Sequence, residues 1–162
     1  MLLLFVTGCA TEPGLDKGKF DELIRAAQEL RAAIGSGKAC DVPDSVLQRL
    51  VSGTAALRGK IASKAERDLL AAFANLATSA QDGLLLCRSR SQLAVLNIVP
   101  KGRINVTQEL DPIVDKYDLP IESHVYAPTG ARLKTISVDA IKVIWEKAAV
   151  QIRNIEVTLK YS

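Results

Sequence analysis

The feature that most constrains the fold of this chain is an apolar pattern at helical spacing over residues 63–96. Apolar residues recur there at three- and four-residue steps, as they do on one face of an α-helix. The residues of this face are Leu69, Leu70, Phe73, Leu76, Ala77, Ala80, Leu84 and Cys87. Ser63 and Glu66 have the spacing of a capping box, which begins a helix. We therefore expect one long helix that ends near Leu96, before Pro100.

Three more segments show the same periodicity. The first covers residues 20–34 and ends at Gly35-Ser36-Gly37, where glycine supplies the backbone conformation that favours a helix stop. The second begins near Pro43, a residue that a first helical turn tolerates. The last is expected to begin with Ser137 as its cap and to continue its apolar face to Leu159. Aromatic residues make up only 4% of the chain, and this composition also favours packing between helices.

Residues 97–136 interrupt the helical pattern. Four prolines punctuate them, namely Pro100, Pro112, Pro120 and Pro128. A short helix over 107–118 and isolated strand-like pieces over 103–106 and 123–126 are expected within an otherwise irregular connection. The predicted fold is all-α, a four-helix bundle with a long Pro-punctuated crossover before the last helix. Residues 19–162 are expected to form this single helical domain.

The N-terminal residues carry a targeting pattern. Val6-Thr7-Gly8-Cys9 resembles the lipobox of bacterial lipoproteins, in which an aliphatic residue and two small residues precede the cysteine that is acylated. The resemblance implies that Cys9 carries a lipid anchor, that residues 1–8 are the remnant of a signal peptide, and that 9–18 form a lipidated tether. It also implies a membrane-anchored location in the cell envelope, with the outer membrane favoured because Ala10 follows the cysteine.

The segment before Cys9 is shorter than a secretory signal. It contains no Lys or Arg, and its apolar part covers only Leu2 to Val6, whereas a signal has a basic start and ~7–15 apolar residues. We therefore expect translation to begin upstream of Met1. The alternative is a cytosolic protein with an apolar N-terminal tail. No later apolar run approaches the ~20 residues that span a bilayer, so the expected membrane contact is the anchor alone.

The cysteine count fits the lipoprotein resemblance. With Cys9 acylated, Cys40 and Cys87 remain as an even pair, which would form a disulfide in an oxidising compartment. If the second and third helices form a hairpin, both cysteines lie ~38–39 Å from its turn, at similar heights. The alternative is two buried free thiols in a cytosolic protein.

Little in the chain predicts catalysis, a cofactor or a metal. The single histidine, His124, lies in a Pro-rich segment, and the cysteine spacings match no zinc pattern. Acidic residues gather at helical spacing between 111 and 122, where we favour a solvated face over a cation site. These residues are Asp111, Asp115, Asp118 and Glu122. The net charge of +3 is too small for a nucleic-acid binder.

Residues that could contact a partner concentrate in the irregular connection. Basic residues occur near its two ends, and we favour an ordinary solvated surface for them. The alternative is that they bind anionic lipid headgroups or a negatively charged envelope polymer. This basic set is Arg88, Arg90, Lys101, Arg103, Arg132 and Lys134. Aromatic and apolar loop residues favour a protein contact or packing of the loop on the bundle. The candidate partner-binding residues are Tyr117, Leu119, Ile121, Tyr126, Arg103 and Arg132.

The sequence therefore predicts a non-enzymatic envelope lipoprotein that binds or scaffolds a partner protein. The first alternative is a carrier that holds a small apolar ligand between helices, which a pocket of several hundred Å³ would favour over a filled core. The second alternative is a cytosolic helical protein, should the lipobox resemblance be coincidental.

Overall fold

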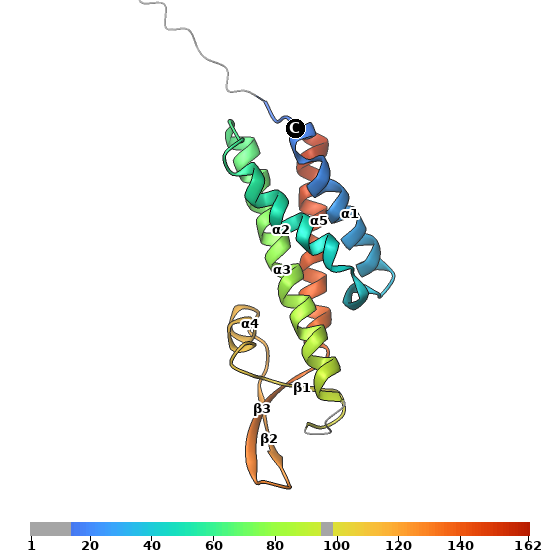
Figure 1. Ribbon diagram of the computed structural model, residues 1–162, viewed down its shortest axis with the longest axis vertical. Helices are drawn as coiled ribbons and strands as arrows, with labels where there is room; N and C mark the ends of the chain where they lie inside the picture. Colours follow the sequence, from blue (N-terminus) through green and yellow to red (C-terminus); the bar gives the residue numbers. More distant parts are fainter. Residues whose placement is uncertain (1–13, 95–98) are drawn as a thin grey trace, which may run out of the picture.

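The computed structural model describes residues 14–94 and 99–162, with only the backbone described for 92–94. Four helices lie along one another in an elongated rod, and a small sheet extends from one end of it (Figure 1). The helices of the rod are α1 (Asp21–Gly35), α2 (Asp44–Leu57), α3 (Lys64–Ala94) and α5 (Ala140–Tyr161). The described residues also form the helix α4 (Asp111–Lys116) and the 3-10 turns η1 (Lys17–Phe20) and η2 (Ala39–Asp41). The short α4 lies next to the sheet, outside the rod.

The start of α3 is the capping box that the sequence predicts. The Glu66 N–H donates to Ser63 Oγ at 3.1 Å, and the Glu66 carboxylate accepts from the N–H groups of Ala62 and Ser63. The same carboxylate accepts from Lys19 Nζ at 2.7 Å, although Glu66 is buried. This ion pair connects η1 to the first turn of α3, and so it closes one end of the rod.

The helix stop after α1 is also as expected. Gly37 has a φ of 72°, a backbone conformation that favours glycine, and the Lys38 N–H donates to Ala33 O at 2.9 Å. The turn leads into η2, which carries Cys40. The chain then enters α2 through Pro43.

The core of the rod is formed mainly by α3 and α5. Gly83 of α3 faces Trp145 of α5, and a Cβ at position 83 would lie only 2.7 Å from the indole ring. The absent side chain therefore lets the large indole approach the α3 backbone. Near the other end of α3, Phe20 and Phe73 stack with ring centroids 6.0 Å apart. By length and composition alone, Lys64–Ser91 could cross a membrane, but 56% of an apolar stretch of 18 residues within it is buried inside the fold, as expected of a core helix.

The prediction of an all-α bundle is wrong, because the chain forms a three-stranded antiparallel sheet. The strands are β1 (Arg103–Asn105), β2 (Glu122–Tyr126) and β3 (Ala131–Ser137), in the order β1-β3-β2. Residues 97–136, expected as an irregular crossover, thus contain β1, α4, β2 and most of β3. The architecture is α+β, with the sheet packed on the end of the helical rod.

The sheet forms because its central strand has a face to bury. Ile104 and Ile136 lie opposite each other in register and are fully buried, in one apolar cluster with the helices. β2 and β3 join through a short connection that ends at Gly130, whose φ of 69° favours glycine. Ser137, expected to cap the last helix, ends β3 instead. Its hydroxyl accepts from the Asp139 N–H at 3.1 Å.

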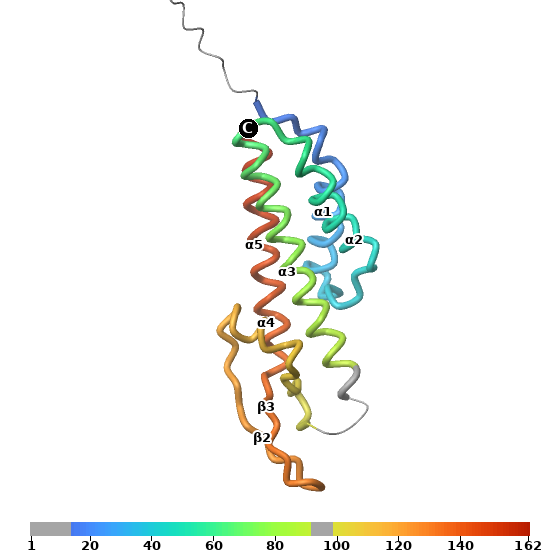
Figure 2. The backbone as a smooth tube through the Cα atoms, turned by 60° about the vertical axis from the view of Figure 1, so that its left-hand side comes forward, coloured from blue at the N-terminus to red at the C-terminus, as the bar shows by residue number. Residues whose placement is uncertain are grey.

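The two ends of the rod differ in what they carry. η1, the turn between α2 and α3, and the C-terminus lie at one end, whereas the β2–β3 hairpin forms the opposite end (Figures 1 and 2). The hairpin extends past the ends of the helices, so part of the sheet has no helix beneath it (Figure 1).

Candidate functional site

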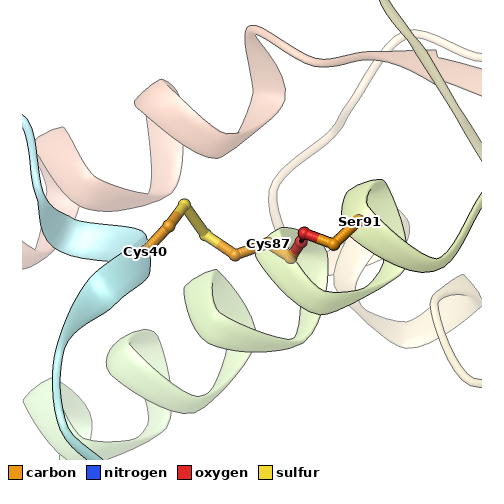
Figure 3. Close-up of a disulfide and its surroundings, with 3 residues drawn as sticks. All are labelled: Cys40, Cys87 and Ser91. Atoms are coloured by element: carbon orange, nitrogen blue, oxygen red, sulfur yellow. Dashed lines mark hydrogen bonds between the residues drawn. A yellow bond between two sulfur atoms is a disulfide. The ribbon is translucent and has the colours of Figure 1, made fainter. Parts of the chain in front are cut away.

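A disulfide joins Cys40 of η2 to Cys87 of α3 (Figure 3). The two Cα atoms lie 5.6 Å apart, so the residues are at the same height in the rod. Cys40 is exposed and Cys87 is buried. Ser91 follows one turn later, and its hydroxyl donates to Cys87 O at 3.1 Å. The bridge ties the connection between α1 and α2 to the longest helix. Cys9, the predicted lipidation residue, lies outside the described residues.

Two of the candidate partner-binding residues belong to the packing of α4 against the rod. Leu119 is buried in the apolar core. The Tyr117 hydroxyl donates to Asp82 of α3 at 2.9 Å and lies 3.3 Å from Ser79 Oγ. Burial raises the pKa of the Tyr117 phenol; the hydrogen bond with Ser79 opposes this, and the one to Asp82 adds to it. These contacts hold α4 against the rod and occupy the Tyr117 hydroxyl.

Arg103 also has a structural role. Its guanidinium donates to Thr135 Oγ1 and Thr135 O at 3.1–3.2 Å, and to Glu122 at 3.0 Å. These bonds run across all three strands, and its side chain is only 16% exposed. Arg103 therefore holds the sheet together rather than contacting a partner.

The remaining candidates lie on the hairpin surface. Ile121, just before β2, is 46% exposed, Tyr126 at the end of β2 is half-buried, and Arg132 on β3 is exposed. The structure adds Val125, which is 54% exposed and lies opposite Arg132 in register. Sequence reasoning missed Val125 as a surface residue. The signal was available, because two alternating segments separated by Ala-Pro-Thr-Gly are typical of a hairpin.

The outer edge of β2 has no neighbouring strand among the described residues, since β3 occupies the centre of the sheet. In an antiparallel sheet, every second residue of such a strand points its N–H and C=O groups away from its partner. Edges of this kind are usually blunted by lysine, proline or a bulge, and β2, with the sequence Glu-Ser-His-Val-Tyr, has neither lysine nor proline. The backbone groups on this edge are therefore not paired with another described strand.

The acidic residues do not gather into a site. Glu122 pairs with Arg103, and Asp111 lies 4.0 Å from Lys134 Nζ. Asp115 and Asp118 are exposed around the end of α4. In residues 14–94 and 99–162, no group of three potential metal ligands comes together. His124 is half-buried on β2, opposite Leu133.

The basic set is dispersed rather than combined into one patch. Arg88 pairs with Asp44 of α2 at 2.8 Å, and Arg103 is held within the sheet. Arg132 lies on the hairpin, whereas Arg90 faces a groove beside α5. The sequence alone does not reveal this dispersion, because it depends on how α3 and the sheet are placed relative to each other.

That groove has a volume of about 490 Å³ and lies between the C-terminal end of α1, η2, α3 and the first turns of α5. A smaller groove, of about 290 Å³, lies between α1 and α5 near the other end of the rod. Both are open to the surface, and the bundle core between them is filled by side chains.

Comparison with known proteins identifies no relative of this chain: no family model, no curated protein and no solved structure matches it.

Proposed function

We propose that this protein is a lipid-anchored module of the cell envelope that presents its β2–β3 hairpin to a partner protein, away from the membrane. The observation that carries the proposal is the position of the two ends. The chain enters the fold at the end of the rod opposite the hairpin (Figures 1 and 2). With 31 residues at about 1.5 Å each, α3 alone separates the ends by roughly 46 Å.

The anchor rests on the resemblance of Val6–Cys9 to a lipobox. Lys17, the first residue of η1, is eight positions after Cys9, and eight residues cover at most about 29 Å, so η1 and its end of the rod would lie close to the headgroups. The Cys40–Cys87 disulfide is consistent with an oxidising compartment, where disulfides persist. Together these features support a protein that works at a membrane surface outside the cytoplasm.

The hairpin offers two means of binding a partner. The open edge of β2 can pair with an extended segment through backbone hydrogen bonds, and exposed Ile121, just before β2, and Val125, on β2, add apolar contacts beside that edge. We therefore infer that the partner contributes an extended strand.

The anchor is tested by intact mass and membrane fractionation of the protein expressed from its own gene, with Cys9→Ser as the control. A di- or triacyl mass increment on residues 9–162 that the control lacks is the expected result. An unmodified soluble product that keeps Met1 would contradict the anchored location.

The docking surface is tested by crosslinking in intact cells with Val125→Lys. Lysine on an edge strand disfavours pairing with another strand, so the crosslinked partner is expected to disappear. Val157→Lys on α5 is the matched control, since Val125 and Val157 are 54% and 55% exposed. Equal crosslinking of both variants would show that the partner binds elsewhere.

A further inference from the structure

The groove of about 490 Å³ beside α5 has the size of a small-molecule site, for which 300–1,000 Å³ is typical. Its apolar walls come from two sides. The end of α1 and η2 supply Ile34 and Ala39, and the start of α5, with the residues just before it, supplies Val138, Ile141 and Trp145. Charged side chains line it as well, namely Arg90, Asp139, Lys142 and Glu146. An apolar surface with a few charged groups suits an amphiphilic ligand.

The carboxylates of this groove already have partners. Glu146 lies 3.7 Å from Lys142 Nζ, and Asp139 accepts from the Ser137 hydroxyl at 3.1 Å. Asp139 also stands at the N-terminus of α5, where a negative charge is favourable. The acidic groups of the groove are therefore compensated within the protein.

One cation of the groove has no carboxylate partner. The Arg90 side chain is exposed, lines the groove and forms no ion pair within residues 14–94 and 99–162. The Trp145 indole N–H makes no hydrogen bond in the same residues either, but it is buried and so is not open to the groove. A guanidinium without a counter-ion suits a ligand that carries a negative charge.

We propose that this groove binds a small anionic amphiphile, with its apolar chain against Ile141 and Trp145 and its carboxylate at Arg90. A guanidinium and a carboxylate form charge-assisted hydrogen bonds, which are stronger than neutral ones. The Cys40–Cys87 disulfide helps to form the site, because Cys40 lines the groove and the bridge fixes η2 against α3. This site lies on the rod, apart from the hairpin, and is independent of the proposed docking function.

Trp145 makes the proposal directly testable, because it is the single tryptophan of the chain. We would titrate the full chain, with its disulfide verified by mass, with 11-bromoundecanoate below its micelle concentration. Bromine next to the indole quenches its fluorescence, so saturable quenching is expected. Unbrominated undecanoate should restore the signal by competition. Quenching that does not saturate, or that undecanoate does not reverse, would overturn the proposal.

The charge requirement is tested with 11-bromo-1-undecanol, which has the same chain and no carboxylate. We expect it to bind about tenfold more weakly, since it cannot form the charge-assisted contact with Arg90. Equal affinity for the alcohol would identify a purely apolar groove and overturn the anionic ligand. Quenching that depends on protein concentration would indicate a second copy of the chain in the groove, which would also overturn it.

The position of the carboxylate is tested with Arg90→Gln. This substitution at an exposed position should lower the affinity for 11-bromoundecanoate about threefold to tenfold and leave the affinity for the alcohol unchanged. Arg153→Gln is the matched control, because Arg153 is exposed on α5 but does not line the groove. Equal affinities for the two variants would contradict the assignment of Arg90.

Discussion

At the residue scale, Glu66 shows how one buried carboxylate serves two elements. It caps α3 and accepts from Lys19, which comes from a different part of the chain. The hydrogen bond from Lys19, followed by those from the backbone, lowers the pKa of Glu66 from 4.5 to about 2. A carboxyl that is protonated more readily in the unfolded chain couples folding to pH.

The expected pH dependence has a definite sign. Above about pH 4.5, Glu66 is ionised in both states and its contribution to stability is complete; that contribution is lost as the pH falls towards about 2. Chemical denaturation between pH 5 and pH 2, as a working range, should show a steeper loss of stability for the wild-type protein than for Glu66→Gln. Glu109→Gln, at an exposed position, should follow the wild type. Parallel curves for all three proteins would disprove this role.

Gly83 is required by packing rather than by backbone conformation. A methyl group there would lie 2.7–2.9 Å from three atoms of the Trp145 indole, which is itself fixed in the core. Gly83→Ala should therefore destabilise the protein by about 1–3 kcal/mol, despite the better helix propensity of alanine. Gly35→Ala in α1 meets no atom within 4 Å and is expected to be neutral or slightly stabilising. Urea unfolding measures the free energy of unfolding of both variants. A Gly83→Ala protein as stable as the wild type would contradict this role of Gly83.

At the element scale, the disulfide restrains the connection between α1 and α2. It closes a segment of 47 residues, for which loop-closure entropy alone predicts about 4 kcal/mol of stabilisation. The double variant Cys40→Ser/Cys87→Ser should lose about 2–4 kcal/mol, measured by denaturation. The wild-type protein under reducing conditions should lose a similar amount. An unchanged midpoint in both experiments would show that packing alone holds η2 on α3.

The sheet and the helices belong to one core at the scale of the whole molecule. Ile104 and Ile136 of the sheet form one apolar cluster with residues of α1, α2, α3 and α5. Ile136→Ala should therefore cost about 2–5 kcal/mol. Fluorescence of Trp145 and far-ultraviolet circular dichroism should report the same lowered midpoint, since the unit unfolds cooperatively. Two separate transitions would instead show that the sheet unfolds independently of the rod.

The molecule is elongated, and its two ends carry different elements (Figures 1 and 2). A long rod separates the end where the chain enters from the hairpin (Figures 1 and 2). The groove beside α5 lies on the rod, apart from the hairpin. The proposed docking edge and the proposed ligand groove thus occupy different parts of the same structure. Each can be altered by substitutions that leave the other unchanged.

Local patterns in the sequence determined the helices. The periodicity of residues 63–96, the capping box at Ser63 and Glu66, and the stop around Gly37 all appear in the structure near the expected positions. These features depend on neighbours within one or two helical turns, so a single sequence contains them. The pairing of Cys40 with Cys87 was expected from the cysteine count, and the helix lengths agreed with it, because a hairpin of two helices sets the height of each residue.

Only the tertiary structure decided the sheet and the surfaces. β1 pairs with β3 across about 30 residues, as the Arg103–Thr135 contact shows, and no local periodicity encodes a pairing so distant. The same folding buried Leu119 and engaged Tyr117, which the sequence offered as partner contacts, and left Val125 exposed. The groove exists because η2, α3 and α5 meet there. A side chain's neighbours, and so its function, depend on this assembly of elements more than on its own segment.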